Sequence, residues 1–231
     1  MKNTIIKDLS ADALHFLEDQ KKLHTYDVQE QILRDLVRRF PDHSNYDGVE
    51  VKAKLLNLFY STGIQAIDKV VEKIMSIKNI DEVLLRAKYN KELVDTIAKL
   101  ELADGKVRIN YSFATKYCAL HQPNKYPIFD SIVEGVLETL MVKGELPPYN
   151  YKKGAFEEQL RDYDFFVQVY DRFMECYGLK GKLTYREVDW YLWGSYKQGE
   201  TQTEIERLTQ LDMSLYSVYV PKQINQSIVI K

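Results

Sequence analysis

Asp130, Ser112 and Lys116 are the residues of this sequence whose types and spacing could do chemistry. Ser112 and Lys116 are four residues apart, so a helix would place both on one face. Asp130 stands directly before Ser131-Ile-Val-Glu134, which has the capping-box form S-x-x-E. Because Ser131 can cap that helix, we expect the Asp130 carboxylate to be free at a positive helix N-terminus. The alternatives for Asp130 are a helix-end charge or a buried hydrogen-bond partner, and the alternative for Lys116 is a surface lysine.

Two predicted helices and a tight connection position these three residues. The first helix runs from about Tyr111 to His121, where apolar residues recur at helical spacing. Pro123 follows its end, and the residue before a proline is pushed out of helical geometry. The second helix is expected to start at Ser131.

Apolar residues at helical spacing predict helices along most of the chain, and strands nowhere alternate with helices, so we expect an all-α fold. Val28, Ile32, Leu36 and Phe40 recur every four residues and should face the core. The predicted helices span about 10–23, 27–40, 48–61, 64–77, 81–89, 91–102, 111–121, 131–142, 156–177, 184–197 and 200–211.

We predict a single all-α unit over residues 1–231. Residues 50–140 should form its core layer, and segments 1–49 and 154–213 should pack on this layer as flanking helices. Residues 143–154 contain two glycines and two prolines, which is typical of a surface loop. Residues 214–231 form an irregular tail that the pattern does not place.

Composition narrows the classes of function. The 231 residues carry a formal net charge of −2, so no overall basic field attracts nucleic acid. Two cysteines fit no metal spacing and cannot supply the four thiolates of an iron–sulfur cluster, so no metal or cofactor is expected. No signal peptide and no long apolar run are visible, which predicts a cytoplasmic protein with no membrane contact.

Two segments resemble the helix–hairpin–helix (HhH-GPD) base-excision DNA glycosylases, the group of endonuclease III, adenine glycosylases and 8-oxoguanine glycosylases. One is 54–74, an apolar helix, a short polar loop and a second helix. The other is Ser112-Phe-Ala114, followed sixteen residues later by Asp130, where the family places its catalytic Asp before a helix. The resemblance covers roughly residues 50–140 and implies a two-layer helical glycosylase fold.

The resemblance implies hydrolysis of an N-glycosidic bond in damaged duplex DNA, without strand cleavage. The Asp130 carboxylate would stabilise positive charge on the sugar or act on water. It should lie at the mouth of a cleft, facing Ser112 and Lys116. Ser112 stands where bifunctional members carry a Schiff-base lysine, and Lys116 could reach the same space.

The target base must leave the stack and enter a pocket, where aromatic side chains hold it. Core packing is the alternative for each aromatic candidate, and we expect one of the two tryptophans to be buried and the other to line a groove. Gln65 could fill space in the duplex. The candidates for substrate binding are Tyr60, Gln65, Tyr111, Tyr117, Phe129, Trp190 and Trp193.

One departure from the family keeps other functions open. The family's hairpin has several glycines that let backbone N–H groups approach phosphate, whereas residues 104–111 contain only one. A catalytically inactive, glycosylase-like scaffold that binds nucleic acid is therefore the second hypothesis. A protein-interaction scaffold that binds no nucleic acid is the third.

Overall fold

The computed structural model describes residues 5, 7–23, 27–102, 105–143, 146 and 156–197. These residues form eleven helices and one two-stranded sheet, which confirms the predicted all-α class. The predicted helix 200–211 and the tail 214–231 lie outside the described residues. The elements are α1 (Ser10–Leu23), α2 (Asp27–Arg39), α3 (Tyr46–Phe59), α4 (Ile67–Met75), α5 (Ile80–Leu85), α6 (Lys91–Ala98), β1 (Lys99–Glu101), β2 (Val107–Ile109), α7 (Tyr111–His121), α8 (Ser131–Val142), α9 (Phe156–Leu160), α10 (Tyr163–Cys176) and α11 (Tyr185–Lys197).

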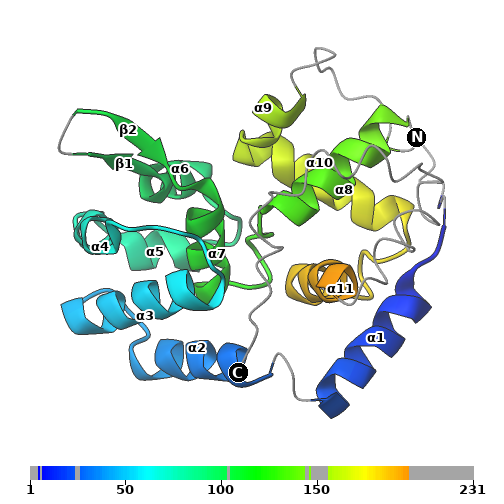
Figure 1. Ribbon diagram of the computed structural model, residues 1–231, viewed down its shortest axis with the longest axis horizontal. Coiled ribbons are helices and arrows are strands. Elements are labelled where there is room, and N and C mark those ends of the chain that lie inside the picture. The colour runs from blue at the N-terminus through cyan, green and yellow to red at the C-terminus, as the bar shows by residue number, and fades with distance from the viewer. Residues whose placement is uncertain are drawn as a thin grey trace, which may run out of the picture.

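The helices form two lobes (Figure 1). Helices α2 to α7 and the β1–β2 hairpin form one lobe, in which α2 packs on α3 and α7. Helix α1 joins α8 to α11 in the other, where α11 packs on both α1 and α8. Most of residues 50–140, the predicted core layer, lie in the first lobe. This lobe starts before residue 50, at α2, and ends at α7, whereas α8 belongs to the second lobe.

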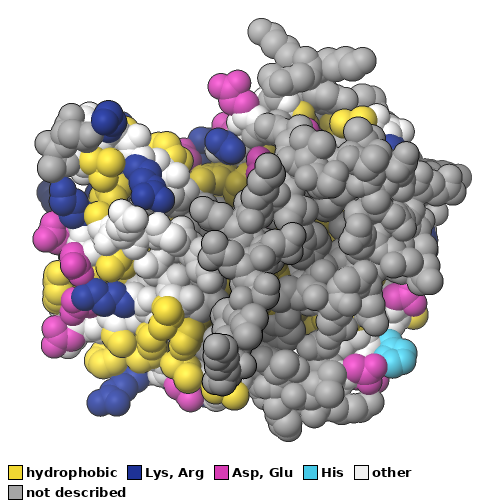
Figure 2. All heavy atoms as spheres, in the orientation of Figure 1, with side chains coloured by type: hydrophobic (Ala, Val, Ile, Leu, Met, Phe, Trp, Pro, Cys, Tyr) yellow, Lys and Arg dark blue, Asp and Glu magenta, His cyan; other side chains and the backbone are white. Residues whose placement is uncertain are grey.

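The predicted inward face of α2 is only partly buried. Val28 is 63% and Ile32 38% exposed, and Leu36 and Phe40 are half-buried. The side chain of α2 that the core covers is Leu33, at 1% exposed, which lies outside the predicted repeat. Hydrophobic side chains reach the surface over α2 and α3, as Figure 2 shows in yellow. Spacing identifies an apolar stripe, but the direction from which α3 and α7 pack determines which part of the stripe is covered.

A β-hairpin replaces the end of the predicted helix 91–102. Helix α6 ends at Ala98, and β1 pairs antiparallel with β2, so that Lys99 lies opposite Ile109. Gly105 lies in the turn with φ +79°, a left-handed conformation that glycine adopts without steric cost. The connection from α6 to α7 is thus a short β-ribbon.

The predicted long helix 156–177 is two helices. Asp162 has an extended backbone, and its carboxylate accepts hydrogen bonds from the N–H groups of Asp164 and Phe165. This is an N-cap, and it starts α10 after α9 has ended at Leu160.

None of the described helices combines the length and apolar character that a membrane span requires.

Tyr163, the first residue of α10, joins the two lobes. Its ring is fully buried and lies edge-on to Tyr89 and Tyr111 of the other lobe, with ring centroids 5.4 and 6.3 Å away. The Tyr163 hydroxyl donates to the carbonyl of Pro127 at 2.9 Å. These contacts hold the start of α10 against the α2–α7 lobe.

Candidate active site between the two lobes

Ser112, Lys116 and Asp130 meet where α7 faces the start of α8. The Lys116 ammonium donates to the Ser112 hydroxyl at 2.9 Å, one helical turn away. Asp130 Oδ2 lies 3.5 Å from Lys116 Nζ. The Lys116 side chain is 7% and the Asp130 side chain 12% exposed, so this ion pair is shielded from water. The predicted meeting of the three side chains is therefore observed.

Asp130, and not Ser131, caps α8, which corrects the sequence-based interpretation. Asp130 Oδ1 accepts hydrogen bonds from the N–H groups of Ile132 and Val133 at 3.1 and 3.0 Å. Its extended backbone places the carboxylate over the first turn, whereas Ser131 is already helical and exposed. One carboxylate oxygen thus caps the helix, and the other faces Lys116.

A pocket of about 380 Å³ lies beside this cluster, between the lobes. Lys116 lines it, but Asp130 is not among the described residues that do. The lysine therefore takes the place at the cleft that the sequence analysis assigned to the aspartate. The lining residues come from α2, α7, α11 and the connections that follow α3, follow α7 and precede α11: Glu30, Arg34, Tyr60, Lys116, Ala119, Leu120, Pro123, Asn124, Ile128, Thr184, Arg186, Glu187 and Trp190.

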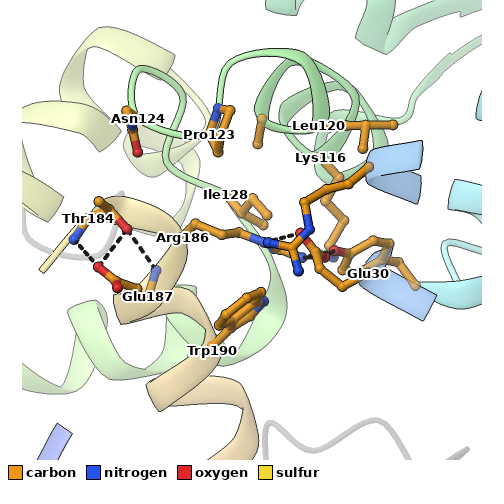
Figure 3. Close-up of a pocket in the computed structure, with 13 residues that line it drawn as sticks. Glu30, Lys116, Leu120, Pro123, Asn124, Ile128, Thr184, Arg186, Glu187 and Trp190 are labelled. Atoms are coloured by element: carbon orange, nitrogen blue, oxygen red, sulfur yellow. Dashed lines mark hydrogen bonds and ion pairs between the residues drawn. The ribbon is translucent and has the colours of Figure 1, made fainter. Parts of the chain in front are cut away.

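Arg186 of α11 reaches across the pocket to Glu30 of α2 (Figure 3). Its Nη2 lies 2.5 Å from Glu30 Oε2, and its Nε lies 3.4 Å from Glu30 Oε1. Nη2 also donates to the Tyr60 hydroxyl, which in turn donates to Glu30. On the other side, Nη1 donates to Asp189 at 2.7 Å. Arg186 therefore links residues 156 positions apart in the sequence.

The second carboxylate beside Arg186 is deeply buried. Asp189 is 5% exposed, and this burial raises the pKa of its carboxyl to about 7, although Arg186 favours the ionised form. The nearby Asp130 carboxylate raises the pKa further, and Lys116 opposes that effect. Asp189 thus titrates near neutral pH within the same charged network.

Cations already lie over the two aromatic rings of the pocket. Lys116 Nζ is 5.5 Å and the Arg186 guanidinium 5.3 Å from the centre of the Tyr60 ring. Arg34 and Arg186 lie 5.8 and 5.5 Å from the Trp190 ring. A base that stacks on either ring must share it with these cations or displace them.

Two of the predicted substrate-binding residues line the pocket. Tyr60 and Trp190 line the pocket, while Trp193 is half-buried and lies outside its lining. Neither tryptophan is fully buried, because Tyr191 and Leu192 supply the buried face of α11 instead.

Like Trp193, four more of the predicted substrate-binding residues do not line the pocket. Tyr111, Tyr117 and Phe129 are core residues, at most 6% exposed. Tyr111 packs edge-on against Phe129, and the Tyr117 hydroxyl lies 3.0 Å from a His43 ring nitrogen. Gln65 is exposed in the connection from α3 to α4. For the three aromatic residues, the core-packing alternative holds.

Sequence reasoning missed Glu30, Arg186 and Asp189. On the exposed face of the predicted helix 27–40, Arg34 can contact phosphate or belong to a solvated face, and the structure places it in the pocket lining. One local signal existed, because Arg186 and Asp189 are three residues apart and so lie on one helix face. The partnership with Glu30 leaves no such signal, since it depends on how α2 and α11 face each other.

Fold and site together define a two-lobed helical protein with a charged pocket between the lobes. A family model described as an N-terminal domain, HI_0787_N, matches residues 12–125. An uncharacterized protein of Haemophilus influenzae is 34% identical over 137 residues, which are 59% of this chain and 60% of that protein. The chain thus spans about three-fifths of the length of this curated relative. No solved structure matches the chain.

The matched range begins within α1 and ends shortly after α7. It contains Glu30, Tyr60 and Lys116, and it stops before Asp130 and Arg186. The described residues contain no group of three or more His, Cys, Asp and Glu that could hold a metal ion.

Proposed function

We propose that the protein is a DNA glycosylase of the HhH-GPD type, which hydrolyses the N-glycosidic bond of a base extruded from damaged duplex DNA. The observation that carries the proposal is the shielded cluster of Asp130, Lys116 and Ser112 beside a pocket between two helical lobes. Asp130 also stands immediately before a helix, as the family resemblance requires of the catalytic residue.

In this mechanism, water attacks the anomeric carbon as the bond to the base breaks. The base leaves with the bonding electron pair, and the proton of the water passes to a carboxylate. Asp130 Oδ2 is the oxygen for this role, because Oδ1 caps α8. The carboxylate also stabilises the positive charge that develops on the sugar.

The position of Lys116 favours a second route at the same site. Lys116 lines the pocket, so its amine is nearer to an entering nucleotide than Asp130 is. After passing a proton to Asp130, the amine could itself attack the anomeric carbon. The base would leave with the bonding electron pair, and breaking of the ring C–O bond would then convert the product into a covalent imine with the opened sugar. The enzyme would then also cut the strand.

Asp130→Asn tests the proposal. Asn keeps both the shape and the capping ability of the residue, so α8 should remain folded. The charge is lost, and base release should fall by about 10²–10³ while DNA binding is retained. The measurement is base release from a panel of lesion-bearing duplexes. Asp162→Asn neutralises the matching cap of α10 and should leave base release unchanged.

Borohydride trapping separates the two routes. Water attack leaves no trapped adduct, whereas attack by Lys116 gives a covalent protein–DNA product that Lys116→Gln abolishes. If the wild-type protein binds duplex DNA but releases no base from any lesion, the scaffold hypothesis replaces the enzymatic one. Absence of salt-dependent DNA binding would instead favour a protein partner.

A further inference from the structure

The side-chain geometry around Arg186 is that of an occupied anion site. A guanidinium binds a carboxylate or a phosphate through two parallel N–H donors. Nε and Nη2 of Arg186 are directed in this way at the two carboxylate oxygens of Glu30. The pair lies in the pocket lining, and the two side chains are 12% and 13% exposed.

Arg186 is held in place independently of Glu30. Its third nitrogen, Nη1, donates to Asp189 of the same helix at 2.7 Å. Asp189 is buried, and the Arg186 guanidinium also lies over the rings of Tyr60 and Trp190. These contacts would keep the fork directed into the pocket if Glu30 moved away.

Glu30 is the partner that can leave. It comes from α2 in the opposite lobe, and its contacts at the pocket are with Arg186 and the Tyr60 hydroxyl. The other lining carboxylate, Glu187, is engaged with the N–H and hydroxyl of Thr184. Glu187 therefore completes a capping box with Thr184 at the start of α11 and does not compete for Arg186.

We propose that Arg186 binds a phosphate oxyanion of the ligand, and that Glu30 occupies this site until the ligand displaces it. Lys116 and Arg34 line the same pocket and present two further cations to the incoming group. This inference rests on the proposed function, in which the phosphate is a diester of the strand whose base enters the pocket. Free phosphate has the same chemistry and is the other source to be tested.

Two substitutions with opposite expected effects test the proposal. Glu30→Gln keeps the size of the residue and removes its competing charge, so it should tighten binding of a short duplex with one unpaired base on the order of tenfold. Arg186→Gln removes the fork and should weaken binding on the order of tenfold. A purely structural ion pair predicts no tightening for either variant, because each leaves a buried partner uncompensated.

Matched controls isolate the effect of Glu30 from general charge. Asp35 lies on the same helix as Glu30 and pairs with exposed Arg38, so Asp35→Asn removes one negative charge away from the pocket. Glu30→Gln must tighten binding more than Asp35→Asn does. Arg186→Lys keeps the positive charge without the fork, and it supplies the weakening arm if Arg186→Gln does not fold.

Binding should be measured as a function of salt for the duplex and separately for inorganic phosphate. Tightening by Glu30→Gln with the duplex alone assigns the site to a strand phosphate, and tightening with both ligands assigns it to the phosphate group itself. The proposal is overturned if Glu30→Gln binds both no more tightly than Asp35→Asn. Base release by the wild-type protein is scored separately, so the glycosylase proposal can fail while this one stands.

Discussion

The rings of His43, Tyr117 and His121 pack together inside the α2–α7 lobe. His43 Nδ1 lies 2.6 Å from Asp81, and its Nε2 lies 3.0 Å from the Tyr117 hydroxyl. The His121 ring is 4.8 Å from that of His43, and its Nε2 is buried without a hydrogen-bond partner among the described residues. Burial lowers the pKa of both histidines below the usual value near 6.5.

These lowered pKa values predict acid sensitivity. Well above pH 6.5 both histidines are neutral in the folded and unfolded chains, so they do not change stability with pH. Below pH 6.5 the unfolded chain binds protons that the folded protein does not, and the free energy of unfolding falls by up to about 1.4 kcal/mol per pH unit for each histidine. Asp189 has the opposite effect, because its raised pKa adds stability as the pH falls below about 7.

Two histidine variants isolate the contribution of His121 to this pH dependence. His121→Phe keeps an aromatic ring and removes the titrating group, so its stability should fall less steeply than that of the wild type between pH 6.5 and 5. His15→Phe changes a side chain that is 77% exposed and should keep the wild-type slope. The measurement is urea unfolding at each pH. Equal slopes for His121→Phe and the wild type would contradict the prediction.

At the scale of elements, single capping residues decide where the helices start. Asp130 caps α8, Asp162 caps α10, and Asn45 caps α3 by accepting from the N–H of Gly48 at 2.8 Å. Each is a short polar side chain that satisfies N–H groups which have no partner within the helix. The break between α9 and α10 depends on one such residue.

Asp162→Ala should remove the α10 cap and lower the free energy of unfolding by about 1 kcal/mol. Asp162→Asn keeps a capping oxygen and should retain most of that stability. The two variants also separate the cap from charge, since Asp162 Oδ2 lies 3.6 Å from Lys91 Nζ of α6. Equal loss in both variants, measured by chemical denaturation, would show that the ion pair and not the cap matters.

At the scale of the whole molecule, Tyr163 couples the lobes. Tyr163→Ala removes a fully buried ring from the contact with Tyr89 and Tyr111, and should cost about 3–5 kcal/mol. Tyr163→Phe removes only the hydrogen bond to Pro127, and should cost about 1 kcal/mol.

The two probes of unfolding report different parts of the molecule. The two tryptophans of the chain, Trp190 and Trp193, both lie in α11, so fluorescence follows that lobe while circular dichroism follows all helices. The transitions should coincide in the wild type and in Tyr163→Phe. They should separate in Tyr163→Ala, and coincident transitions in that variant would show that other contacts couple the lobes.

The sequence alone determined the helical class, the extent of α1 and α7 and the starts of α8 and α11. Caps, prolines and helical spacing act over a few residues, so these features can be predicted from neighbours in the chain. The same locality placed Ser112 and Lys116 on one face. It did not show that Asp130 caps its own helix, since Asp130 and Ser131 are both good caps and the backbone conformation chooses between them.

Only the tertiary structure decided which residues form the site. Glu30 and Arg186 are 156 positions apart and meet because α2 and α11 face each other across the pocket. Tyr60 and Tyr111 are both tyrosines that the sequence predicts to bind substrate, yet Tyr60 lines the pocket and Tyr111 is buried in the core. The packing of the lobes decides whether a side chain lines the pocket or lies in the core, because burial depends on every element that covers the side chain. The spacing of apolar residues describes only the helix that carries it.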